Sequence, residues 1–273
     1  MKPKWLIEDF AEDNNYFRLA DEVKRQGYDY ELITYTPFQS GSFDRFSDDE
    51  CVIVVASLQL AGQLLNQKKW TPNAWLNLKQ YECSYYYAHL GKYLFNDKYI
   101  MLPRTEAKRR ITELFEMYGK EDCIFIRPSS GFKTFTGKVF SKDNFDSDWK
   151  WVDEFTNPED LVIVSTPKDI KAEWRFVIAE GEVISGSMYK LNKTPKYKRE
   201  WFSEAINLAN EVAKQFSPDP MYVLDICQGA DDNFYLLEIG SFSCAGLYSC
   251  DVEPIVRRAS EIALKAWTDI YEM

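Results

Sequence analysis

Histidine is nearly absent: His89 is the single histidine in a chain of 273 residues. A single histidine disfavours acid–base catalysis by histidine and a histidine-rich zinc centre. The six cysteines contain no CxxC pair, and most of them lie in apolar runs. They therefore indicate reduced thiols of a cytoplasmic protein and not a disulfide framework. A catalytic thiol at Cys244 or Cys250 is disfavoured because His89 is distant in sequence.

The chain also lacks a long apolar run and a dominant basic segment. No stretch is long enough to cross a membrane, and we expect no membrane partner. The formal net charge is −10, which argues against a nucleic-acid binder.

Aromatic residues are abundant, with 18 Phe, 17 Tyr and 8 Trp, and they indicate a well-packed globular protein. Residues 1–60 alternate between strand and helix patterns, and the run CVIVVA at 51–56 is typical of a parallel strand covered on both faces. This predicts an α/β (α+β) fold that opens with a β-α-β layer. The layer is either a substrate-binding platform or scaffold.

Two acids mark a predicted β-hairpin over residues 221–241. Asp225 and Glu238 each stand in an apolar run, where charges are rarely buried without a partner. A loop with an even number of residues would place them directly opposite each other and favour Mg²⁺, or Mn²⁺, bound by oxygen ligands. An odd loop would place them on opposite faces of the sheet.

Cations accompany these acids in two other predicted hairpins. Arg127 ends a strand before the small-residue loop that contains Lys133, an arrangement suited to phosphate oxygens. Glu173, Arg175 and Lys190 belong to a second hairpin over 172–191. Each hairpin has a simpler interpretation, as a plain turn or as surface ion pairing.

Four stretches in this order resemble the ATP-grasp fold, and most closely its R2K clade. They are FIRPSSGFKTFTG at 125–137, DLVIVSTP at 160–167, EWRFVIAEGEVISGSMYK at 173–190 and YVLDICQGADDNFYLLEIGSFSCAGLY at 222–248. The resemblance covers roughly residues 98–273 and implies two lobes, 98–165 for ATP binding and 166–273 for metal and phosphate. Residues 1–97 fit the α/β domain that precedes such a fold.

The resemblance also implies roles for residues at matching positions. It implies that Arg127 binds the α- and β-phosphates of ATP, and that Lys133 lies in a mobile loop that closes over them. Val164 and Ser165 match the segment that contacts adenine, and Glu173 matches another nucleotide-binding position. Arg175 and Lys190 match the cations that face the transferred phosphoryl group. The implied Mg²⁺ ligands are Asp225 and Glu238.

The implied activity is that of an ATP-dependent ligase, which activates a carboxylate as an acyl phosphate for attack by an amine or thiol. The acid is expected to be an amino acid, a peptide or another small molecule. The alternatives are a nucleotide-binding sensor that no longer catalyses and a kinase on the same fold. The sequence does not predict the oligomeric state.

One position departs from the family pattern. Gly240 replaces the usual Asn two residues after the metal-binding Glu, and Ser241, Ser243 or a water are the candidate substitutes for its oxygen. The basic segment 193–199 is either a flexible strap over an acidic substrate or a solvated loop.

Overall fold

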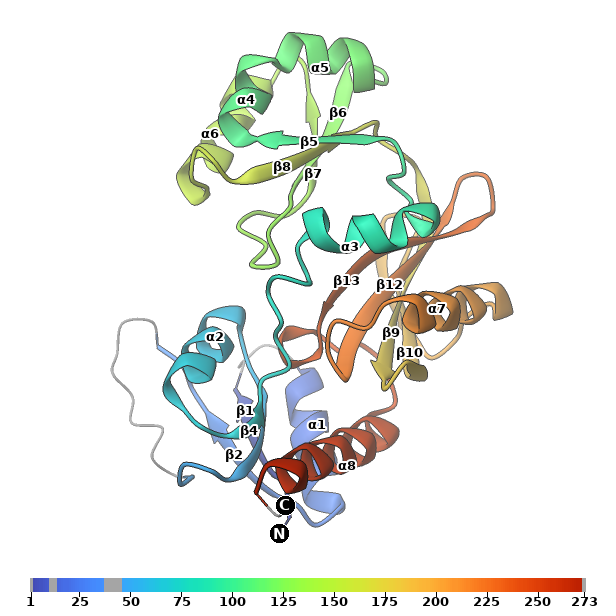
Figure 1. Cartoon of the computed structure of the whole chain (residues 1–273). Helices are drawn as coiled ribbons and strands as arrows, with labels where there is room; N and C mark the ends of the chain where they lie inside the picture. Colours follow the sequence, from blue (N-terminus) through green and yellow to red (C-terminus); the bar gives the residue numbers. More distant parts are fainter. Residues whose placement is uncertain (1, 10–13, 37–45, 272–273) are drawn as a thin grey trace.

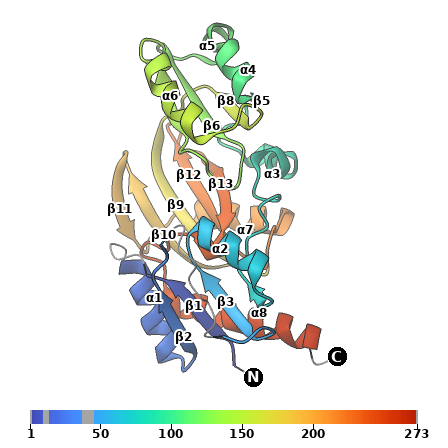
Figure 2. The ribbon, with the colours of Figure 1, turned by 90° about the vertical axis from the view of Figure 1, so that its left-hand side faces the viewer.

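A computed structural model describes residues 2–9, 14–36 and 46–271. Figure 1 shows three β-sheets one above another, each with its own helices. We refer to them as the lower body, the central sheet and the upper lobe. The view in Figure 2, turned by 90°, shows the same vertical order.

The lower body is a four-stranded parallel sheet in the order β2-β1-β3-β4. Its strands are β1 (Lys4–Glu8), β2 (Asp29–Ile33), β3 (Cys51–Val55) and β4 (Thr71–Asn73), and its helices are α1 (Asn14–Arg25), α2 (Leu58–Gln67) and α8 (Val252–Tyr271). Every residue of β3 is buried, as its apolar run predicts. Helix α8, from the far end of the chain, packs on this sheet beside α1.

The central sheet is antiparallel, with five strands in the order β11-β10-β9-β12-β13. The strands are β9 (Ile170–Ala179), β10 (Glu182–Leu191), β11 (Thr194–Lys198), β12 (Met221–Gly229) and β13 (Phe234–Ser241). One face carries Trp174, Phe176 and Leu224 and is packed by α7 (Ser203–Gln215) and α3 (Cys83–Leu90).

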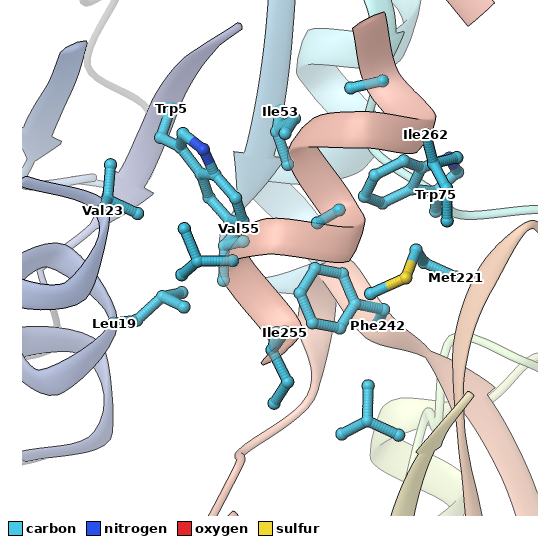
Figure 3. Packing of buried hydrophobic residues seen from close by; sticks show 14 of the residues in the cluster. Trp5, Leu19, Val23, Ile53, Val55, Trp75, Met221, Phe242, Ile255 and Ile262 are labelled. Carbon is cyan, nitrogen blue, oxygen red and sulfur yellow. The ribbon is translucent and has the colours of Figure 1, made fainter. Parts of the chain in front are cut away.

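The other face of the central sheet joins the lower body in one continuous core. Val177, Met221 and Val223 from the sheet share a cluster with residues of β1, β3 and α8. Figure 3 shows Met221 near Trp75 and Phe242, with Trp5 and Ile53 beside them in the same cluster. This shared packing holds the central sheet against the lower body.

The upper lobe is a four-stranded antiparallel sheet in the order β5-β8-β6-β7. It consists of β5 (Tyr99–Pro103), β6 (Cys123–Pro128), β7 (Lys138–Ser141) and β8 (Leu161–Ser165), with α4 (Arg104–Arg109), α5 (Ile111–Tyr118) and α6 (Phe145–Phe155). These three helices cover one face around the aromatic residues Phe140, Phe145 and Trp149. The turn η1 (Gly91–Tyr93) precedes β5.

The segment 193–199 differs from both of its expected forms. Most of it is strand β11, which pairs with β10 at the edge of the central sheet. The connecting residues Asn192 and Lys193 both have positive φ, at 48° and 66°, as a two-residue hairpin turn requires. The segment is therefore an ordered edge strand, and not a flexible strap or a loop.

Candidate functional site

Asp225 and Glu238 are direct cross-strand partners in the β12–β13 hairpin. An even loop is not the cause of this pairing. Gln228 pairs with Phe234, so the loop between these two residues has an odd number of residues. The register instead shifts between the pairs Ile226–Leu236 and Asp225–Glu238, so that Leu237 is an extra residue. A β-bulge of this kind re-aims the side chains that follow it, and here it brings the two acids together.

Each of these two carboxylates is already paired with cations. Arg175 donates from Nε and Nη2 to the two oxygens of Asp225, both at 2.8 Å. Lys133 and Arg127 donate to Glu238 at 2.8 and 3.1 Å. These two cations come from the upper lobe, so Glu238 joins the lobe to the central sheet.

Charge dominates the ionisation of Glu238. Burial alone would raise the pKa of its carboxyl, but the charges of Lys133 and Arg127 outweigh burial and lower the pKa to about 2. Glu238 is therefore ionised at neutral pH, and its charge is matched by these two cations.

A third acid, Glu173, lies on β9 close to this pair. Its carboxylate accepts a hydrogen bond of 2.6 Å from the hydroxyl of Tyr189 and forms an ion pair of 3.0 Å with Lys190. The Tyr189 hydroxyl also lies 3.4 Å from Asp225 Oδ2. Tyr189 thus bridges the two carboxylates, a connection that the sequence reasoning missed.

A cavity of about 640 Å³ opens between the upper lobe and the central sheet. Phe125, Phe135, Ile170 and Leu237 supply apolar lining. The cations that line it are Arg127, Lys133, Lys168, Lys190 and Lys193, and the acids are Glu173 and Glu238. Its size is that of a small-molecule site, and its excess of cations suits a polyanion.

The candidate site residues are not all brought together in this cavity. Arg127, Lys133, Glu173, Lys190 and Glu238 line it. Arg175 and Asp225 lie next to it and line a smaller cavity, which also contains Arg127, Lys133 and Glu238.

Val164 and Ser165 line neither of these two cavities. Both are fully buried in β8, which is paired on both sides, by β5 and β6. Lys168, three residues beyond Ser165, does reach the larger cavity, and so does Lys193. Sequence reasoning did not assign Lys168 to the site, and its position shortly after the strand was the available signal. Lys193 is the first residue of the basic segment 193–199, for which a place over an acidic substrate was one of the two interpretations.

Gly240 lacks the side-chain oxygen of the usual Asn, and both neighbouring serine hydroxyls are bonded to Trp75. The Ser241 hydroxyl donates to the carbonyl of Trp75 at 2.6 Å, and the Ser243 hydroxyl accepts from the N–H of Trp75 at 3.0 Å. Both side chains tie the central sheet to the segment before α3, since a buried hydroxyl needs a partner. The expectation that one of them, or a water, takes the place of the Asn stays a prediction.

The residues present fit a magnesium ion that arrives together with phosphates. Mg²⁺ is commonly held by one or two carboxylates plus substrate phosphates and water, and Asp225 and Glu238 supply two carboxylates. Within the described residues, no three Asp, Glu, His or Cys side chains group as a self-sufficient metal site. Arg175, Lys133 and Arg127 also neutralise both acids, so we expect the carboxylates alone to bind Mg²⁺ weakly.

The fold and the cation-lined cavity define an ATP-grasp protein. The family model for the ATP-grasp domain, R2K clade family 2, matches residues 105–257, and the chain belongs to this family. The predicted ATP-grasp fold is thereby confirmed. No curated protein matches the chain by sequence. None of the described helices is long and apolar enough to span a bilayer.

Solved structures with the same fold extend over the whole chain. D-cycloserine synthetase DcsG matches with a TM-score of 0.68 at 13% identity, over 96% of this chain and 99% of that one. The ATP-grasp ligase PsnB complexed with minimal precursor gives 0.58 at 11%, over 96% and 100%. D-alanine–D-alanine ligase from Bacillus anthracis gives 0.59 at 12%, over 99% and 98%. At these identities the likeness establishes the fold alone.

Proposed function

We propose that this protein is an ATP-dependent ligase that joins a carboxylic acid to an amine or thiol. The observation that carries the proposal is the cross-strand carboxylate pair Asp225–Glu238: Glu238 lines a cavity with five lining cations, and Asp225 lies next to that cavity. ATP-grasp proteins are mostly ligases, and PsnB has been solved with Mg and ADP. Those facts support ATP and Mg²⁺ as the cofactors here.

The proposed reaction has two steps. An oxygen of the acid attacks the γ-phosphorus of ATP, and the bond from this phosphorus to the β,γ-bridging oxygen breaks. ADP departs as the leaving group, and the acid becomes an acyl phosphate. The amine nitrogen or thiol sulfur then attacks the acyl carbon, inorganic phosphate leaves, and the nucleophile loses a proton. Positioning and charge neutralisation supply most of the rate in phosphoryl transfer, which fits a site without histidine.

The side chains would divide this work by position. Arg127 and Lys133 would bind the phosphates. Val164 and Ser165 would contact the adenine of ATP. Glu173 would hold Lys190 in place. Lys190 and Arg175 would face the transferred phosphoryl group. Mg²⁺, held by Asp225 and Glu238, would neutralise charge on the β- and γ-phosphates.

A second candidate function is a nucleotide sensor without turnover. The observation that favours it is the lost oxygen at Gly240, because the hydroxyls of Ser241 and Ser243 are bound to Trp75. A second metal ion would then lack a protein ligand.

ADP release from Mg-ATP, with and without a pool of amino acids, small acids and peptides, separates these functions. We expect the pool to stimulate release of ADP and free phosphate in the wild type. Glu238→Gln should abolish the stimulation, because it removes the charge of a metal ligand, and should leave the circular dichroism spectrum unchanged. Lys138→Ala, which removes a surface ion pair with Asp148 in the upper lobe, is the matched control and should respond like the wild type.

Two outcomes would contradict the ligase, and a third would contradict the metal assignment alone. Full activity in Glu238→Gln would show that Glu238 is not a required metal ligand. A product that keeps the phosphate would indicate a kinase. Binding of ATP without release of ADP under every condition would favour the sensor.

A further inference from the structure

The segment 246–250 leads from the central sheet into α8, and it contacts Arg175 directly. The carbonyl of Gly246 accepts a hydrogen bond of 3.0 Å from Arg175 Nη1. The ring of Tyr248 lies 5.0 Å from the Arg175 guanidinium. Because Arg175 Nε and Nη2 are bound to Asp225, this segment holds the third nitrogen, Nη1.

The backbone of this segment depends on its surroundings. Tyr248 has a φ of 50°, which lies in the left-handed region that residues other than glycine seldom adopt. Such a conformation persists when the surrounding structure holds it. The position of the Tyr248 ring therefore depends on the contacts that fix the neighbouring carbonyls.

Two arginines bind three consecutive carbonyls of the segment. Arg18 of α1 donates from Nη1 to the carbonyl of Tyr248 and from Nη2 to that of Cys250, both at 2.8 Å. Arg199 donates from Nε to the carbonyl of Ser249, which lies between them, at 2.7 Å. The planar guanidinium of Arg18 presents its donors in a rigid fork, so it fixes the spacing and the direction of both carbonyls.

We infer that Arg18 is a positioning residue for Arg175. It acts through the segment 246–250, in which the carbonyl of Gly246 and the ring of Tyr248 orient the guanidinium. The inference rests on the proposed function, which assigns Arg175 to the transferred phosphoryl group. Under it, α1 of the lower body serves the reaction although Arg18 lines neither cavity.

A purely structural role for Arg18 would tie α1 to the core and leave Arg175 unaffected. The two roles have different kinetic consequences. Loss of a structural tie lowers Tm but leaves the folded protein with the wild-type rate. Loss of positioning lowers the rate of molecules that remain folded, because a displacement of about 1 Å at the reacting centre costs up to about a hundredfold.

The test measures the maximal rate of ADP release stimulated by the pool of amino acids, small acids and peptides, together with the KM for ATP. Assays are run below the Tm of each variant, and circular dichroism checks folding. We expect Arg18→Ala to lower the maximal rate by about tenfold to a hundredfold. The KM for ATP should stay unchanged, because Arg127 and Lys133, the proposed phosphate-binding residues, belong to the upper lobe.

The matched control is Arg25→Ala, the same substitution on the same helix. Arg25 pairs with Glu22 at 2.6 Å, and its side chain is 63% exposed. This variant should keep the wild-type rate. Should Arg18→Ala fail to fold, Arg18→Lys replaces it: one ammonium group keeps the charge but lacks the fork that binds both carbonyls, so its rate should also fall.

A double-mutant cycle tests the route from Arg18 to Arg175. Tyr248→Ala removes the ring beside the guanidinium and should lower the rate by itself. In a protein that already carries Tyr248→Ala, the effect of Arg18→Ala should be smaller by about threefold or more, because residues that act on the same group are not additive. Equal effects of Arg18→Ala with and without Tyr248 would overturn the route.

The outcomes separate this inference from the function on which it rests. A wild-type rate in folded Arg18→Ala overturns the inference and leaves the ligase intact, even if Tm falls. A rise in the KM for ATP without a lower maximal rate also overturns it. If the pool stimulates no ADP release in the wild type, the ligase itself fails, and the inference fails with it.

Discussion

Asp219 is a partly buried carboxylate that accepts more than one hydrogen bond. It accepts hydrogen bonds from the N–H of Asn77 and the hydroxyl of Tyr81, and so it fixes the segment that forms one wall of the smaller cavity. Burial raises the pKa of its carboxyl above the ordinary value, although the bonds from Asn77 and Tyr81 oppose that rise. Its ionisation therefore costs folding free energy.

The sign of the resulting pH dependence follows from linkage. An acid whose pKa is raised by folding contributes stability below its unfolded pKa of 3.8, and the contribution is lost as pH rises through the folded value. Asp219→Asn cannot ionise. We expect its free energy of unfolding, relative to wild type, to increase as the pH rises from 3.8 toward neutral, as measured by urea unfolding. A difference that stays constant over this range would contradict the assignment.

The candidate residues illustrate what a sequence can predict at this scale. Asp225 and Glu238 are recognisable because charged residues in apolar runs need partners. Their mutual pairing depends on the bulge at Leu237, which no local signal marks. Ser241 and Ser243 form hydrogen bonds with Trp75, which is more than 160 residues away in the sequence. Contacts over such a separation are not predicted by the local sequence.

Strand β11 joins the site through a stack of three tyrosine rings. Tyr248 lies between Tyr197 of β11, at 5.4 Å, and Tyr189 of β10, at 4.8 Å, with nearly parallel planes. The Arg175 guanidinium lies 5.0 Å from the Tyr248 ring. The outer ring thus supports residues that contact Asp225.

Tyr197→Ala should lower the free energy of unfolding, although the Tyr197 ring is 57% exposed. Loss of one aromatic contact costs about 1 kcal/mol, which corresponds to a decrease in Tm of about 2–4 °C for a protein of this size. Thermal unfolding followed by circular dichroism measures it. Tyr197→Phe keeps the ring and serves as the control; an equal decrease in both variants would show that the hydroxyl matters and not the stacking.

Elements with strong periodic patterns are those that the sequence predicts well. The strands of the hairpins predicted over 172–191 and 221–241 lie within a few residues of those bounds. The helical pattern over residues 105–118 predicts one helix, but the structure divides it at Arg110 into α4 and α5. β4 and β11 were missed because each is short, contains Pro and pairs at a sheet edge, so tertiary context and not propensity determines it.

At the scale of the whole molecule, the contacts of Glu238 couple the upper lobe to the central sheet. Lys133 and Arg127 hold Glu238 from above, while Arg175 holds Asp225 within the sheet. Phosphates that attract these cations would release the carboxylates for a metal ion. Binding of metal and nucleotide should therefore be cooperative.

We expect Mn²⁺ to bind about tenfold or more tightly with ADP present than alone, within the usual range of coupling between two ligands. Electron paramagnetic resonance of free Mn²⁺ measures both affinities. Lys133→Ala removes a competitor from Glu238 and should tighten the binding of Mn²⁺ alone, which reduces the coupling. Equal Mn²⁺ affinity with and without ADP in the wild type would rule out this competition.

The position of α8 has a consequence for the order in which the protein forms. Its residues Ile255, Ala259 and Ala263 complete the core around Trp5 and Ile53, and Trp5 donates to Ser260 at 3.2 Å. During synthesis the lower body is thus begun before the other two sheets and completed after them. Until α8 leaves the ribosome, the face of the first sheet that α8 covers stays exposed. We therefore expect the nascent chain to depend most on chaperones over that interval.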